Sequence, residues 1–247
     1  MTPESLTAVL DATWPALRFH AEGPWLVREG GAGGNRVTCI TARTGWSDAD
    51  LPLAEAAAAR IGQRTIFMIR DGEETLDGAL AARGYRFADP VRIWSVPVDR
   101  LAGEIPFLGA FEVWPPLAAM TTIWEGDGIG PARIAIMERA PGPKTAILGR
   151  VSDRPAGVAF VALAGADAML HALTVALPFR RRGCAATILR AAANWAAAQG
   201  ATMLHLAVTR ENAPANALYA SAGMEVSAQY HYRAGPKPVE SQRDRST

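Results

Sequence analysis

The order of apolar and polar positions along the chain predicts strands alternating with helices, which is typical of an α/β protein. Short apolar runs bounded by glycine or proline indicate strands, and longer segments with apolar residues three and four positions apart indicate helices. The expected strands lie at 24–28, 36–41, 65–69, 91–96, 111–114, 144–151, 157–163, 169–175, 201–208 and 224–232. The expected helices lie at 2–10, 51–61, 73–82, 117–124, 132–139, 185–199 and 213–221.

Four glycines between residues 30 and 34 could cradle a phosphate or simply reverse the chain. A phosphate loop is followed by a helix, because the helix start supplies the N–H groups that bind the anion. The segment after these glycines, Arg36-Val-Thr-Cys-Ile-Thr, is typical of a strand instead. We therefore expect a β-hairpin loop here.

A strand, a basic turn and a helix start follow one another between residues 168 and 186. Pro178 ends the apolar run, the turn reads Arg180-Arg-Arg-Gly-Cys-Ala, and the Ala-rich segment after it stops before Gly200. This order directs the unpaired N–H groups of a helix start toward an anion. The three arginines add positive charge, so the stretch predicts that the protein binds a phosphorylated ligand.

Composition limits the classes of partner. The chain has 247 residues, a length that suits one large domain or two smaller ones, and 49% of them are apolar. Its net charge is +1. Balanced charge gives no electrostatic reason to expect a nucleic acid or an anionic membrane as the main partner. Without a signal pattern or an apolar run near the ~18 residues of a membrane span, we expect a cytoplasmic protein.

The two cysteines, Cys39 and Cys184, lie too far apart in the sequence for a metal motif, so we expect no metal site. Cys184 lies at a predicted helix start beside arginines, a position that can lower the pKa of a thiol. Packing of a small residue in the turn is the simpler interpretation of this cysteine.

The chain contains an internal repeat. When Gly84 is placed over Gly223 without gaps, residues 66–69 lie over residues 205–208, and a strand, a helix, a glycine and a strand recur in the same order. The repeat predicts two copies of one fold, with chance similarity between two strand–helix–strand segments as the alternative.

The two copies differ where chemistry is expected. Before residue 51 the first copy has only Ala42-Arg-Thr-Gly-Trp-Ser-Asp in place of the basic turn. Leu80 takes the place of Tyr219, and Glu73 that of Asn212. We therefore expect the first copy to be structural or to wall one side of a substrate cleft.

Two motifs carry a family resemblance. The spacing Arg180-x-x-Gly183-x-Ala185 is similar to the Arg/Gln-x-x-Gly-x-Gly/Ala turn with which the GNAT acetyltransferase superfamily binds the pyrophosphate of acetyl-CoA. Residues 208–224 resemble the GNAT pattern Val-x-x-x-Asn-x-x-Ala-x-x-Leu-Tyr-x-x-x-Gly-Phe, with Met224 in place of the phenylalanine. The matching positions are Asn212, Ala215, Leu218, Tyr219 and Gly223.

The resemblance covers about residues 108–233 and, more faintly, 24–100. It implies an α/β GNAT fold, with a central, twisted, mixed and mostly antiparallel sheet flanked by helices, here duplicated. We expect a degenerate GNAT-like domain without the cofactor turn at 1–105, a catalytic GNAT domain at 106–235, and a disordered tail at 236–247.

The resemblance further implies acetyl-CoA as co-substrate. The strand before the turn would pair with the pantetheine arm, the Val175 N–H would face the thioester carbonyl, and N–H groups of the turn would hold the pyrophosphate. Asn212 would brace nearby backbone as a helix cap. The expected cofactor-binding residues are Leu173, Thr174, Val175, Arg180, Arg181, Arg182, Gly183, Cys184, Ala185, Ala186, Asn212 and Tyr219.

Tyr219 matches the tyrosine that the family often uses as a general acid toward the CoA sulfur. A hydrogen bond to that sulfur and a purely structural, half-buried tyrosine are the other interpretations. His171 is a candidate general base on the strand, predicted to share a face with Met169, Leu173 and Val175. Its place resembles that of a histidine in arylalkylamine N-acetyltransferases. The alternative for His171 is a buried core histidine, which is also our interpretation of His205.

Carboxylates in the glycine-rich loop after residue 124 offer a competing base, Glu125 or Asp127. Trp124 and Tyr230 could form walls of the acceptor site. No cysteine or serine is paired with a base at a motif spacing, so no covalent enzyme intermediate is expected.

The sequence therefore predicts an N-acetyltransferase that moves an acetyl group from acetyl-CoA to a primary amine by direct attack in a ternary complex. The acceptor is a small-molecule or peptide amine, and neither its identity nor the oligomeric state can be inferred. A non-catalytic acyl-CoA-binding or sensing module is the main alternative. A nucleotide enzyme is disfavoured because neither a P-loop nor a Gly-x-Gly-x-x-Gly motif is present.

Overall fold

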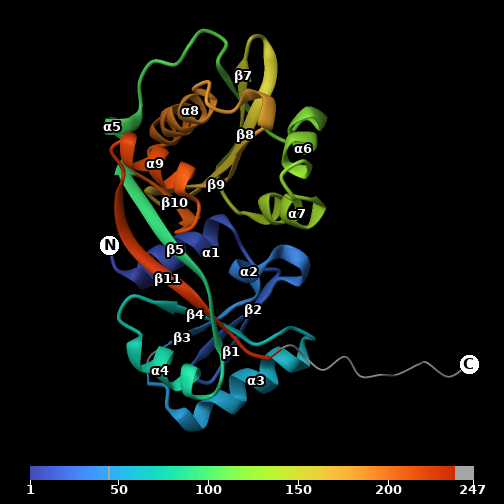
Figure 1. The fold of residues 1–247 in the computed structure, drawn as a ribbon, viewed down its shortest axis with the longest axis vertical. Coiled ribbons are helices and arrows are strands. Elements are labelled where there is room, and N and C mark those ends of the chain that lie inside the picture. Colours follow the sequence, from blue (N-terminus) through green and yellow to red (C-terminus); the bar gives the residue numbers. More distant parts are fainter. Residues whose placement is uncertain (44, 237–247) are drawn as a thin grey trace, which may run out of the picture.

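A computed structural model describes residues 1–43 and 45–236, and all its strands form one 11-stranded sheet in the order β1-β2-β3-β4-β11-β5-β10-β9-β8-β7-β6 (Figure 1). The strands are β1 (Arg18–Glu22), β2 (Trp25–Glu29), β3 (Ile40–Ala42), β4 (Ile66–Arg70), β5 (Arg86–Pro97), β6 (Ala110–Val113), β7 (Lys144–Val151), β8 (Arg154–Ala164), β9 (Asp167–Val175), β10 (Met203–Thr209) and β11 (Glu225–Ala234). The helices are α1 (Pro3–Thr13), η1 (Gly31–Gly33), α2 (Asn35–Thr38), η2 (Asp48–Asp50), α3 (Leu51–Arg60), α4 (Glu74–Ala82), α5 (Val98–Leu101), α6 (Ala118–Glu125), α7 (Pro131–Arg139), η3 (Leu177–Phe179), α8 (Cys184–Ala198) and α9 (Ala213–Ser221).

The strand order confirms the predicted duplication. Strands β1 to β4 occupy one side of the sheet in the same succession that β7 to β10 occupy on the other, and α4 and α9 follow β4 and β10. The last strand of each half is exchanged, because β5 pairs with β10 and β11 pairs with β4. Figure 1 shows these two long strands running side by side between the halves.

Strand exchange interleaves the two halves within one sheet, and the domain boundary expected near residue 105 stays a prediction. Residues 237–247 of the expected tail lie outside the described residues. None of the helices described is long and apolar enough to cross a membrane. The described part of the chain also holds no group of three or more His, Cys, Asp or Glu side chains placed to bind a metal ion.

The hairpin loop and strand predicted for residues 30–41 are wrong. The structure has η1 and α2 there, and β3 begins only at Ile40. A β-carbon on Gly30 would lie 2.1 Å from the Val37 carbonyl oxygen, and one on Gly33 would lie 2.5 Å from the Val37 side chain. The glycines therefore allow a helical turn to fold back tightly on itself, and Val37 becomes completely buried.

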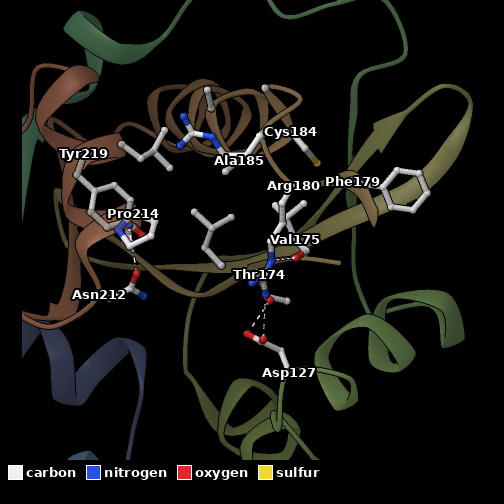
Figure 2. Close-up of a pocket in the computed structure, with 16 residues that line it drawn as sticks. Asp127, Thr174, Val175, Phe179, Arg180, Cys184, Ala185, Asn212, Pro214 and Tyr219 are labelled. Atoms are coloured by element: carbon white, nitrogen blue, oxygen red, sulfur yellow. Dashed lines mark hydrogen bonds and ion pairs between the residues drawn. The ribbon is translucent and has the colours of Figure 1, made fainter. Parts of the chain in front are cut away.

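Close packing of α8 on the sheet positions the basic turn. Alanines on the inner face of α8 are buried, and Ile188 packs so near β7 that a β-carbon on Gly149 would lie 2.6 Å from it. This contact holds the start of α8 beside the end of β9, where Figure 2 shows a cavity.

Candidate active site

A cavity of about 640 Å³ lies between the end of β9 and the starts of α8 and α9 (Figure 2). All of the expected cofactor-binding residues line it except Arg182. Five further residues, which were not expected to bind the cofactor, also line this cavity: Asp127, Phe179, Pro214, Ala215 and Leu218.

The start of α8 has the geometry that suits an anion. Gly183, which precedes the helix, has a φ of 81° and no side chain to cap it, and a β-carbon at this position would meet open space. The first intrahelical backbone bond at this end joins the Thr187 N–H to the Gly183 carbonyl, 3.0 Å apart. The N–H groups of residues 184–186 precede that bond, and their partners must come from outside the helix.

The arginines of the turn are less available than their sequence suggests. Arg180 donates from Nε to the Val175 carbonyl at 2.9 Å and contacts Asp127 at 3.4 Å, so it braces the end of β9. Arg182 donates to Ser152 Oγ at 2.8 Å and lies away from the cavity. Arg181 lines the cavity, with its backbone in the left-handed region at a φ of 61°.

Cys184 has a structural role. Burial raises the pKa of its thiol to about 11, the opposite of the lowered value that a helix start can produce. Its Sγ lies 2.9 Å from where a β-carbon on Gly149 would be. The side chain is packed against β7 as a small residue, which agrees with the packing interpretation of this cysteine.

The edge of β9 that faces β10 is open at the cavity. Pairing between the two parallel strands ends at Leu170 and Leu206, and the strands have no registered pairs beyond that point. A bulge follows at Ala172, whose φ is 53°, and the Trp124 indole N–H holds its carbonyl at 2.8 Å. Trp124, which we expected to form a wall of the acceptor site, is instead fully buried and holds the bulge through this hydrogen bond.

The bulge overturns the predicted face of β9. Leu173 and Val175 pack with the core beneath α8, whereas Met169 packs with a separate core that includes α1. His171 points to the α1 side, because the extra residue in β9 inverts the alternation of side chains after it.

His171 lies at a second cavity of about 550 Å³, on the other side of the opening. The side chain is only 3% exposed, and its Nε2 is 2.9 Å from Thr13 Oγ1. Nδ1 is buried and has no hydrogen-bond partner among the residues that the structure describes. Burial lowers the pKa of His171 well below 6.5, and the charge of Arg36 lowers it further, so the imidazole is neutral at pH 7 and is a weaker base than a free histidine.

The two cavities meet where β9 and β10 separate. They share four lining residues, Leu173, Asn212, Ala215 and Tyr219. Asn212 caps α9 by accepting from the Ala215 N–H at 3.2 Å. Tyr219 is buried, which raises its pKa to about 12, and the phenol therefore remains protonated at neutral pH.

The structure places the two candidate carboxylates differently. Glu125 ends α6 as an exposed residue and lines neither cavity. Asp127 lines the first cavity and accepts a 2.7 Å hydrogen bond from Thr174. Tyr230, the other expected wall residue, lines the second cavity.

His205 takes part in a buried network that sequence spacing could not predict. Its Nδ1 is 2.6 Å from Ser95 Oγ and its Nε2 is 2.9 Å from Asp167. The order serine, histidine, aspartate is that of a hydrolase triad. None of the three lines either cavity, so the network joins β5, β10 and β9 as part of the core.

The buried histidines predict a loss of stability at low pH. Burial lowers the pKa of His171, and also that of His205 against the opposing effect of Asp167. Below pH ~6.5 the unfolded chain binds protons that the folded chain does not, so the free energy of unfolding falls with pH. For His171 alone we expect a loss of about 2 kcal/mol between pH 7 and pH 5, measured by urea unfolding. His171→Gln should lose less of its free energy of unfolding between pH 7 and pH 5 than the wild-type protein does. Equal losses in the variant and the wild type would contradict the attribution of this pH dependence to His171.

Comparison with known proteins agrees with this geometry. Residues 114–224 match the Acetyltransferase (GNAT) family. A relative named as the uncharacterized N-acetyltransferase YobR of Bacillus subtilis (strain 168) is 25% identical over 237 residues, covering 90% of this chain and 94% of the relative. The C-terminal part of the chain, which carries this match, belongs to the GNAT superfamily.

Two solved structures show that the GNAT fold extends over nearly the whole chain. A GCN5-related N-acetyltransferase from Kribbella flavida superposes with a TM-score of 0.74 at 19% identity, covering 95% of each chain. A tandem GNAT protein from the clavulanic acid biosynthesis pathway superposes with a TM-score of 0.60 at 15% identity, covering 86% of this chain and 78% of that one. The family match lies in the C-terminal GNAT half, which carries the basic turn.

Proposed function

We propose that this protein transfers an acetyl group from acetyl-CoA to a primary amine. The observation that carries the proposal is the pair of cavities that meet between β9 and β10. One ends at a helix start suited to a pyrophosphate, and the other lies beside a neutral imidazole. Donor and acceptor can then meet in one complex, without a covalent enzyme intermediate.

Each candidate residue has a role that fits its surroundings. The open edge of β9 supplies N–H and C=O groups for the pantetheine arm, and the N–H groups of residues 184–186 hold the pyrophosphate. Because phenol with a pKa of about 12 is a weaker acid than a thiol of pKa about 8.5, Tyr219 donates a hydrogen bond to the departing thiolate rather than a whole proton. Because its lowered pKa makes His171 a weak base, it relays the amine proton only transiently toward solvent, directly or through water.

Calorimetric titration with acetyl-CoA tests the donor, and release of CoA thiol across a panel of primary amines tests the transfer. We expect binding, turnover with part of the panel, and intersecting double-reciprocal plots when both substrates are varied. Parallel plots would contradict direct attack. Binding without turnover on any amine would favour an acyl-CoA-sensing module, and absence of binding would overturn the proposal.

A further inference from the structure

The N-terminal half contributes a side chain to the second cavity. The segment η1–α2 lies between β2 and β3, whereas the corresponding strands β8 and β9 are joined by a short turn. A β-carbon on Gly33 would lie 2.7 Å from Ile136, so the segment rests on α7 of the C-terminal half. Arg36 on α2 thereby lines the cavity that holds His171.

The second cavity carries an excess of positive charge. Arg36 and Arg133 both line it, and the guanidinium of Arg133 lies 3.7 Å from where a β-carbon on Gly34 would be. The arginine ion pairs within the described residues involve other arginines. Asp89 is the one carboxylate among the described residues that line this cavity, and it accepts a hydrogen bond from Asn35 at 2.9 Å. Two cations therefore face one anion.

Arg36 is charged and close to the reacting end of the cavity. Burial alone would lower its pKa, but the neighbouring hydroxyls of Tyr230 and Tyr232 reverse the effect and raise it. The positive charge of Arg36 also lowers the pKa of His171. Among the described residues the buried Tyr230 hydroxyl has no well-formed hydrogen bond, and it lies against Arg36, so its O–H is a second donor beside the arginine. A buried polar group of this kind is costly unless a ligand or water satisfies it.

We propose that the acceptor is an amine that also carries a carboxylate, and that Arg36, supplied by the N-terminal half, binds this carboxylate together with Arg133 and Tyr230. An arginine matches a carboxylate with two parallel hydrogen bonds, which makes the contact selective. The amine end then lies toward His171 and Tyr219. This inference rests on the proposed acetyl transfer, and it gives the first half of the chain a role in selecting the substrate.

Paired ligands test the proposal without requiring turnover. N-acetyl amino acids and the matching N-acetyl amino amides differ only in the carboxylate, and their affinities can be measured by titration for a panel of small, aliphatic and aromatic side chains. We expect the wild-type protein to bind the best acid about tenfold to a hundredfold more tightly than its amide. Arg36→Gln should lose this preference with the affinity for the amide unchanged, and Arg36→Lys should recover part of it. Arg86→Gln, an exposed arginine outside both cavities, is the matched control and should keep the preference.

The outcomes separate the two proposals. Equal affinity for acid and amide in the wild-type protein overturns the carboxylate assignment, even if amines are acetylated. Tighter binding of amides or of dicationic amines overturns it as well, and would point to Asp89. The carboxylate assignment is supported if the wild-type protein prefers acids and Arg36→Gln abolishes that preference. If no amine tested is acetylated, the proposed function on which this assignment rests is wrong.

Discussion

Gly183→Glu should abolish acetyl-CoA binding while leaving the fold intact. The new carboxylate would lie at the start of α8, where it would take the N–H groups offered to the pyrophosphate and repel that anion. We expect the dissociation constant for acetyl-CoA to rise at least about a hundredfold, measured by titration calorimetry. A side chain at a φ of 81° costs about 1 kcal/mol, so the melting temperature should fall by only about 2–4 °C.

Gly200→Glu is the matched control for this substitution. Gly200 follows α8 at its other end, has a φ of 84°, and also leaves open space for a β-carbon. It lines neither cavity. The control should lose similar stability and keep its affinity for acetyl-CoA, so equal loss of binding in the two variants would show that backbone strain, rather than the anion site, is responsible.

Tyr219→Phe should lower kcat about tenfold to a hundredfold. A hydrogen bond to a charged group contributes about 1.5–3 kcal/mol, and the thiolate acquires its charge only as the thioester breaks. The KM for acetyl-CoA should change little, because the ring, which lies 6.4 Å from that of Trp94, is retained. Steady-state kinetics with the best amine of the panel measures both constants.

Tyr85→Phe provides the comparison. This buried tyrosine donates to Glu55 at 2.7 Å and lies outside both cavities. Loss of the Tyr85 hydroxyl should reduce the free energy of unfolding by about 1.5–3 kcal/mol, as for other hydrogen bonds to a charged group, with kcat unchanged. If Tyr219→Phe and Tyr85→Phe had the same small effect on kcat, Tyr219 would be a structural tyrosine and the proposed contact with the thiolate would be wrong.

Apart from β1 and residues 30–41, the sequence by itself determined the order of the main elements, the repeat and the location of the basic turn. These features depend on short-range information: apolar spacing marks strands and helices, and a glycine in a basic turn before an Ala-rich segment marks the start of α8. The strand predicted at 144–151 and the helix predicted at 213–221 coincide with β7 and α9. The residues around the first cavity were predictable for the same reason, because most of them lie in two contiguous motifs.

Only the tertiary structure decided how the halves combine and which groups face the acceptor side. Exchange of β5 and β11 depends on pairing between strands more than a hundred residues apart, which no local pattern encodes. The bulge at Ala172 is held by Trp124 from a distant helix, and it reversed the expected face of Leu173. Arg36 reaches the second cavity because Val37 packs against glycines of the same segment and the segment rests on α7. Such long-range contacts set side-chain direction, whereas periodicity sets only the type of element.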